Sequence, residues 1–184
     1  MNKIILDLCG GSGAWSKPYL DAGYEVYNLT LPLWDIRLMK AYSFTGNTEK
    51  KVYGILAAPP CTYFASSGAR WKRTKEQMLD ALSIVDACLR AVIIYKPKFW
   101  ALENPIGKLT SYLGKPEMYF NPCDYGDPYT KRTALWGNFN IPIKQYVEPT
   151  EGSKLHRLPP SIKRAELRSI TPSGFAKAFF ESNQ

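Results

Sequence analysis

The chain has 184 residues, of which 45% are hydrophobic and 22% charged, and its formal net charge is +8. This length suits one globular domain with its own core, so we expect a single domain over residues 1–184. No apolar stretch is long enough to cross a bilayer, which excludes a helical membrane-spanning protein. The excess of Lys and Arg favours a polyanionic partner, with nucleic acid the first choice.

The cysteines do not form a metal-binding pattern. The four of them lack a CxxC pair and match no zinc spacing, and the chain has a single histidine, His156. We therefore expect no metal. The N-terminal residues reach an acid and glycines too early for a signal peptide. We expect a cytoplasmic protein with reduced thiols.

The first third of the chain has the pattern of a Rossmann-type unit. Residues 3–8 predict a short buried strand, 9–13 a tight glycine turn, 14–22 a helix and 25–29 a second strand. Residues 52–57 form a nearly continuous apolar run, which is typical of a central parallel strand.

The clearest predicted helix covers residues 74–95. Its apolar residues recur every three or four positions, and Thr74 with Gln77 predicts a capping box. Cys88 lies near this apolar stripe and is therefore expected in the core.

The remaining elements are shorter. We predict a strand at 99–103, two last strands at 118–125 and 133–137 that could pair as a hairpin, a long loop over 138–164, and a final helix at 173–182. The chain is therefore predicted to be an α/β protein, with a mostly parallel twisted sheet and helices on both faces.

A glycine-rich turn follows the first strand. In residues 7–13, Gly10, Gly11 and Gly13 would let a ligand approach the backbone closely. The turn is neither a P-loop nor a full dinucleotide fingerprint. A tight turn that binds nothing is the alternative.

Two reactive side chains stand at predicted strand ends. Pro59 and Pro60 stop the strand before Cys61, and Glu103 ends the strand that follows the long helix. Strands joined by one crossover helix are usually neighbours, so both side chains could face one cleft. A thiolate beside a carboxyl group suits attack on an electrophilic heteroaromatic carbon, with the acid protonating a ring nitrogen. The alternatives are a core cysteine and a carboxylate that caps a backbone donor.

Basic residues supply further candidates. Arg132, in the dibasic step Lys131-Arg132, could hold a carbonyl oxygen or a phosphate. Five cations nearer the C-terminus would suit phosphate contacts: Lys154, Arg157, Lys163, Arg164 and Arg168. All of these side chains could instead be simply solvated.

Taken together, these segments resemble the cytosine-C5 DNA methyltransferase family. Residues 7–13 are similar to its first cofactor motif, 58–68 to its Pro-Cys nucleophile loop, and Glu103-Asn104 to its Glu-Asn motif. Residues 125–132 resemble its arginine motif, and 168–172 resemble a divergent form of its last motif. The order is the family's and spans nearly the whole chain.

The resemblance implies a class I methyltransferase fold and S-adenosylmethionine as the methyl donor. It implies that Cys61 adds to C6 of cytosine, that Glu103 contacts or protonates N3, and that Arg132 holds O2 or orients Cys61. The positions that would contact the donor are Asp7, Gly10, Gly11, Gly13, Trp15, Asp35, Pro59 and Ser169. In duplex DNA the target base would be flipped out.

Three departures from the family pattern stand out. Aligned without a gap, the arginine motif falls on Tyr129, Lys131 and Thr133, so a one-residue shift is needed to use Arg132. The second departure is in the donor site, where the position of the usual ribose-binding acid falls near Thr30 and Cys9 replaces a usual Phe, for which Trp15 could supply an apolar wall.

The third departure is length. Only about thirty residues separate Gly137 from Arg168, too few for a target-recognition domain, so base readout would be weak or borrowed from a separate recognition subunit. Such minimal forms resemble those of bacteriophage genomes. Two alternatives stay open: the same chemistry on RNA or a free cytosine nucleotide, and a non-catalytic module that binds nucleic acid or a partner.

Overall fold

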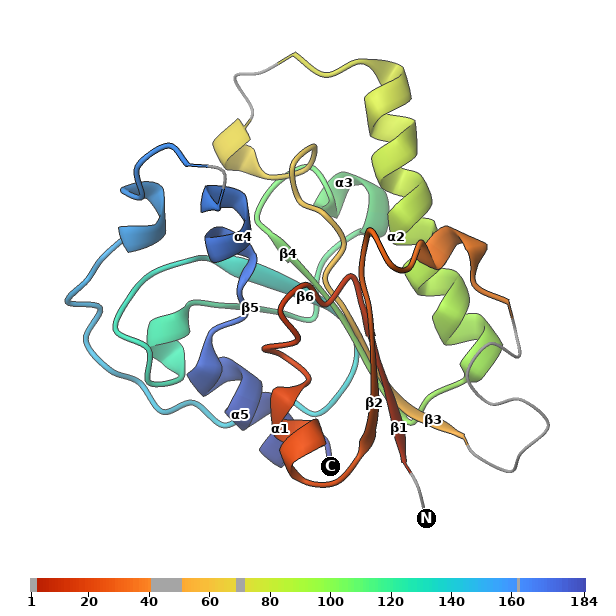
Figure 1. The fold of residues 1–184 in the computed structure, drawn as a ribbon. Coiled ribbons are helices and arrows are strands. Elements are labelled where there is room, and N and C mark those ends of the chain that lie inside the picture. Colours follow the sequence, from red (N-terminus) through yellow and green to blue (C-terminus); the bar gives the residue numbers. More distant parts are fainter. Residues whose placement is uncertain (1–2, 41–50, 69–71, 162) are drawn as a thin grey trace.

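A twisted sheet runs through the centre of the computed structural model, which describes residues 3–40, 51–68, 72–161 and 163–184 (Figure 1). Within these residues six strands lie in the order β2-β1-β3-β4-β6-β5. The strands are β1 (Ile4–Leu8), β2 (Glu25–Leu29), β3 (Val52–Ala57), β4 (Phe99–Pro105), β5 (Met118–Phe120) and β6 (Thr133–Asn138). The first four are parallel, and β6 runs antiparallel to both β4 and β5. The predicted mostly parallel sheet is confirmed.

Helices cover both faces of this sheet, as predicted. In Figure 1, α1 (Lys17–Asp21) and α5 (Ser173–Ser182) lie on one face and the long α2 (Lys75–Tyr95) lies on the other. Shorter helical pieces sit in the connections: α3 (Thr110–Leu113), α4 (Arg164–Ser169), and the 3-10 turns η1 (Ile36–Leu38), η2 (Ser66–Gly68), η3 (Pro122–Asp124) and η4 (Lys154–His156). Among the described residues, no helix is long and apolar enough to cross a membrane.

Each face of the sheet has its own hydrophobic core. Successive side chains of a strand point to opposite faces, so β1 sends Ile4 and Leu6 into the core under α2 and Ile5 into the core under α1 and α5. All five residues of β1 are buried. Cover on both faces explains why the central strands read as continuous apolar runs.

The long helix begins and ends where its sequence predicts. The Thr74 hydroxyl accepts from the Gln77 backbone N–H, and the Gln77 side chain accepts from the Thr74 backbone N–H, which confirms the capping box. The helix is followed by its C-cap residue Lys96, which has a left-handed conformation with φ of 46° and stands just before Pro97. Cys88 is 1% exposed in the core, as expected.

Several short elements differ from their predictions. The first helix begins only at Lys17, with Pro18 in its first turn. The strand predicted over 118–125 ends at Phe120, because Pro122 starts a 3-10 turn. The predicted loop 138–164 contains η4, and α4 follows directly. Residues 41–50, between the second and third predicted strands, lie outside the described residues.

Candidate active site

The nucleophile candidate and the acid candidate are carried by neighbouring strands. β3 and β4 pair in parallel, with Ala57 opposite Leu102, so their carboxyl ends lie at the same edge of the sheet. Cys61 follows β3 by four residues and is partly exposed, and Glu103 lies on β4 with a side chain that is 14% exposed. Both side chains thus stand at the edge where α/β proteins bind ligands.

Asn104 fixes the start of the Cys61 loop. Its side chain is fully buried, and its Nδ2 donates a hydrogen bond of 2.9 Å to the carbonyl of Pro59. The Ala58 N–H donates to the carbonyl of Leu8 on β1. Pro59 itself has no N–H to donate, so its carbonyl is the group through which β4 holds the loop.

The segment after Cys61 is held as firmly. The N–H groups of Phe64 and Ala65 donate to the Cys61 carbonyl at 3.0 and 2.9 Å. Phe64 is fully buried, and its carbonyl accepts from the Lys108 N–H at 2.8 Å. At Gly107 a Cβ would lie 1.9 Å from the Phe64 carbonyl oxygen, so only glycine allows the two segments to lie this close. This contact between Phe64 and residues 107–108, called the strap below, fixes the loop that carries Cys61 to the end of β4.

The basic side chain that lies beside Glu103 is Lys131, whereas the prediction placed Arg132 in the site. The Lys131 Nζ lies 3.7 Å from the Glu103 Oε1, and the two side chains are 15% and 14% exposed. The Arg132 side chain is exposed and its guanidinium lies 5.4 Å from the centre of the Tyr119 ring. Adjacent side chains of an extended segment point to opposite sides, so only one of the two basic residues can face Glu103. The ungapped alignment of the arginine motif had already placed Lys131 there.

Burial and charge act in opposite directions on the Cys61 thiol. Burial raises its pKa most, and the nearby Glu103 carboxylate raises it further. The positive charges of Lys131 and Arg168 lower the pKa of the thiol in part. The protonated form of the thiol is thus favoured, and how readily it ionises depends on whether Glu103 is charged.

A second part of the site is the glycine turn after β1. Asp7 is fully buried beneath it, and its Oδ2 accepts a hydrogen bond of 2.5 Å from the Ser16 hydroxyl. Burial raises the pKa of Asp7 to about 6. A Cβ at Gly10 would lie 2.3 Å from the Asp7 Cγ, so the turn rests directly on this carboxyl group. Gly11 and Gly13 have φ of 54° and 72°, which favours glycine at both positions.

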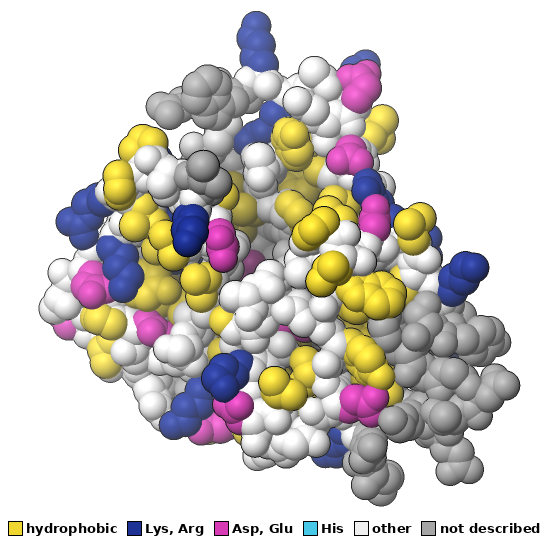
Figure 2. Space-filling model, viewed as in Figure 1, with side chains coloured by type: hydrophobic (Ala, Val, Ile, Leu, Met, Phe, Trp, Pro, Cys, Tyr) yellow, Lys and Arg dark blue, Asp and Glu magenta, His cyan; other side chains and the backbone are white. Residues whose placement is uncertain are grey.

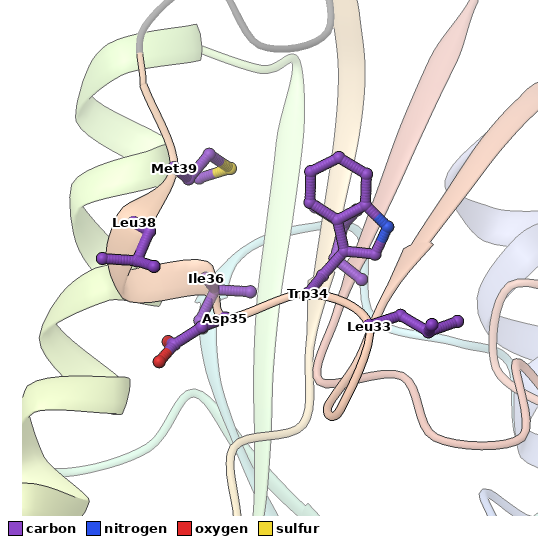
Figure 3. A pocket seen from close by; sticks show the side chains of 7 residues that line it. Leu33, Trp34, Asp35, Ile36, Leu38 and Met39 are labelled. Atoms are coloured by element: carbon purple, nitrogen blue, oxygen red, sulfur yellow. The ribbon is translucent and has the colours of Figure 1, made fainter.

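A cavity of about 230 Å³ opens beside this turn (Figure 3). Its lining comes from the end of β2 and the segment after it: Leu29, Leu33, Trp34, Asp35, Ile36, Leu38 and Met39. The Cys9 N–H donates to the Leu29 carbonyl at 2.7 Å, which joins the glycine turn to the cavity wall. The half-exposed Trp34 ring gives this cavity a flat apolar surface.

The Asp35 side chain is paired with a neighbouring arginine. Its carboxylate accepts from the Arg37 backbone N–H and from the Arg37 guanidinium, at 2.6 to 3.0 Å. This pairing lowers the pKa of Asp35. In Figure 3 the carboxylate points away from Trp34. Asp35 therefore shapes the cavity through the turn it caps, and its predicted contact with the donor stays a prediction.

Two other predicted donor contacts have different surroundings. Trp15 is 1% exposed and packs edge-on against Phe179, with ring centres 5.4 Å apart, so it cannot supply the expected wall to a ligand. Its bulk instead fills the core under the glycine turn. Ser169 is exposed, and its hydroxyl donates to the Glu166 carbonyl within α4.

The sequence prediction missed Ser16 and the anchoring role of Asn104. Asn104 was visible as the partner of Glu103 in the Glu-Asn pair, and a buried polar residue at a strand end needs a partner. Ser16 carried no comparable signal. Within the described part of the chain, no three His, Cys, Asp or Glu side chains are grouped so that they could hold a metal ion.

Comparisons with known proteins point to one class of enzyme. No protein-family model matches the chain. It is 27% identical to the type II methyltransferase M.DdeI of Desulfomicrobium norvegicum, over 72% of this chain and 39% of that protein. It is 23% identical to M.MJ0563P of Methanocaldococcus jannaschii, a candidate type II methyltransferase, over 91% of this chain and 66% of that one. The chain thus spans between about two fifths and two thirds of the length of these relatives.

The fold of this chain is also found in a solved protein structure. A solved structure of a candidate DNA modification methyltransferase, encoded within a prophage of E. coli, aligns with a TM-score of 0.58 and 18% identity. The alignment covers 79% of this chain and 52% of that chain. The two relatives named above are thus a type II methyltransferase and a candidate one, and the fold of this chain is the one found in a candidate methyltransferase structure.

Proposed function

We propose that the protein is a DNA (cytosine-5-)-methyltransferase that uses S-adenosylmethionine. The observation that carries this proposal is the placement of Cys61 and Glu103 on neighbouring strand ends, with Lys131 against the Glu103 carboxylate. A nucleophile and an acid at one edge of a sheet suit addition to a pyrimidine ring. The type II methyltransferase relatives support the choice of DNA as substrate.

The cavity and the glycine turn fit the proposed donor. Trp34, Ile36 and Met39 present the apolar surface that a flat adenine ring needs, and the adjoining turn exposes backbone through Gly10 and Gly11. A ligand can approach the backbone at Gly11, because a Cβ built at this position would meet no atom within 4 Å. When bound, the donor supplies an electrophilic methyl group. Contacts from Gly13, Asp35, Pro59 and Ser169 belong to the same proposal.

In the proposed reaction the Cys61 Sγ forms a bond to C6 of cytosine. The electron pair of the C5–C6 double bond then becomes available at C5, while Glu103, which has taken up a proton from solvent, donates this proton or a hydrogen bond to N3. C5 takes up the methyl group as the bond between that methyl group and the donor sulfur breaks. Loss of the C5 proton to solvent restores the double bond and releases the Cys61 thiolate, and N3 returns its proton to Glu103, so the protein returns unchanged.

The charges of the site couple base binding to activation of Cys61. The Glu103 carboxylate raises the pKa of the thiol. When Glu103 shares a proton with N3 of the bound base, that opposing charge is reduced and Lys131 is left as the nearer influence. A bound cytosine therefore favours the Cys61 thiolate, and in the absence of a bound cytosine the Cys61 thiol stays protonated.

Trapping with a fluorinated substrate tests the proposal. A fluorine at C5 cannot leave as a proton does, so the enzyme incubated with S-adenosylmethionine and a 5-fluorocytosine duplex should stall with Cys61 bonded to C6. The adduct is measured on a denaturing gel and mapped by mass spectrometry.

The control is another cysteine. Cys61→Ala should abolish the adduct, whereas Cys123→Ala, at a buried position in η3, should form it as the natural chain does. An adduct on fluorinated RNA or nucleotide alone would move the same chemistry to that substrate. If no adduct forms on the duplex, the RNA or the nucleotide although donor binding is measured, the proposal is contradicted. The alternative of a non-catalytic binding module would then remain.

A further inference from the structure

A basic segment borders the proposed site. Residues 153–170 contain five Lys and Arg and a single acid, Glu166. In Figure 1 this segment, which includes η4 and α4, lies at the same end of the molecule as the carboxyl ends of the parallel strands. Figure 2 shows Lys and Arg side chains along that margin of the molecule and a hollow in the upper half of the face.

Hydrogen bonds hold this segment beside the loop that carries Lys131. The Glu151 N–H donates to the Pro128 carbonyl and the Thr130 N–H donates to the Gly152 carbonyl, both at 2.9 Å. At the other end, the Gly174 N–H donates to the Asp127 carboxylate at 2.9 Å. The segment is thus tied at both ends to residues 127–130, immediately before Lys131.

The five cations have different roles within the fold. The Lys154 Nζ pairs with the Glu151 carboxylate at 2.5 Å. The guanidiniums of Arg157 and Arg164 donate to the backbone carbonyls of Glu151 and His156 respectively, so they brace the segment. Among the described residues no carboxylate lies within ion-pair distance of Lys163 or Arg168. Lys163 is exposed, and Arg168 is half-buried on the side of the site.

Arg168 lies on α4, within the segment that these hydrogen bonds hold beside the loop that carries Lys131. In agreement with this placement, its charge contributes to lowering the pKa of the Cys61 thiol. In a nucleotide whose C6 lies at Cys61, the flanking phosphates are the nearest anionic groups. An arginine at the rim of such a site suits a phosphate because its donors form a fork.

We infer that Lys163 and Arg168 bind backbone phosphates of DNA next to the target nucleotide. This inference rests on the proposed function, from which it takes DNA as the polymer. Phosphate contacts position a duplex without reading its bases. Binding through this surface is therefore independent of sequence and sensitive to salt.

The test measures duplex binding by fluorescence anisotropy over a range of salt concentrations. Each phosphate contact contributes about 0.9 to the slope of log affinity against log salt, so Lys163→Gln with Arg168→Gln should lower the slope by about two. The matched control is Lys177→Gln, which removes one charge from a Lys on α5 that is 72% exposed. It should leave the slope unchanged.

Two outcomes would overturn the inference. One is a double variant that keeps the natural slope, with unchanged donor binding and thermal unfolding to show that it is folded. The other is a Lys177→Gln variant whose slope falls by about half as much as that of the double variant, which would show that the loss follows net charge and not these two positions. Failure of the proposed function is distinct, because it appears as no 5-fluorocytosine adduct whether or not the salt slopes behave as expected.

Discussion

Two neighbouring charges of opposite sign modify the ionisation of Cys61. Burial raises the pKa of the thiol most, Glu103 raises it further and Lys131 lowers it. At a fixed pH below the thiol pKa, Glu103→Gln should therefore increase the rate of Cys61 alkylation by iodoacetamide several-fold. Lys131→Met should decrease it, because the thiolate is the reactive form. Mass spectrometry of the Cys61 peptide measures the rate without donor or DNA.

Lys131→Arg is the matched variant for this experiment. It keeps the positive charge at the position of the 3.7 Å ion pair and should react close to the natural rate. Arg132→Met removes a charge that faces Tyr119 and should have little effect. If Arg132→Met slowed alkylation more than Lys131→Met, the assignment of Lys131 to the site would be wrong.

The Asp7 carboxyl group predicts a pH dependence of stability. Its pKa of about 6 in the folded chain exceeds its ordinary value of 3.8, so the native state holds the proton more tightly than the unfolded state does. The free energy of unfolding should therefore fall as pH rises from about 4 to 6, by about 3 kcal/mol in all. Urea unfolding at a series of pH values measures this change.

The Asp7→Asn variant separates this effect from other titrations. Asn cannot ionise, so the difference in unfolding free energy between the natural chain and the variant should change across the same pH range. A difference that stays constant with pH would show that Asp7 ionises at its ordinary pKa and would contradict this prediction.

At the scale of elements, the strap between Phe64 and Gly107 positions the catalytic loop. Gly107→Ala would place a Cβ 1.9 Å from a backbone oxygen, so the strap must open. We expect a loss of about 1–3 kcal/mol in unfolding free energy, as for other overpacked sites, together with faster alkylation of Cys61. Gly23→Asn, at a position with open space and φ of 84°, is the control and should change neither measurement. An unaltered Gly107→Ala protein would show that the strap is loose.

How well the elements were predicted depends on whether their signal is local. The bounds of β2, β3 and α5 match the prediction, because each is an uninterrupted apolar or amphipathic run bounded by turn residues. The capping box marks the start of α2 for the same reason. The short α3 and α4 carry no periodicity long enough to detect, and they are helical through their place in the fold.

The sequence predicts those parts of the site whose position depends only on where a strand ends. Cys61 and Glu103 could be placed at one edge because a crossover helix joins their strands. The side to which Lys131 or Arg132 points depends on how the chain enters β6, and the motif alone did not decide it. The burial of Trp15 likewise depends on α5, which lies more than 150 residues away in sequence.

At the scale of the whole molecule, donor binding should stabilise the fold. The cavity joins the segment after β2 to the glycine turn after β1, so a ligand that binds both binds only the native state. At a donor concentration about a hundredfold above Kd, the gain is about 2.7 kcal/mol. Thermal unfolding with and without S-adenosylmethionine measures it, and DNA is not needed.

Trp34 is the residue through which this stabilisation can be tested most directly. Trp34 is 52% exposed, and Trp34→Ala removes the flat surface for the adenine ring, so the donor-induced rise is measured against the Tm of the variant itself without donor. The donor-induced rise in Tm should then largely disappear. Leu79→Ala removes a similarly exposed apolar side chain from α2, away from the cavity, and should keep the full rise. If Trp34→Ala kept it as well, the donor would bind elsewhere, and the glycine turn alone would have to account for its affinity.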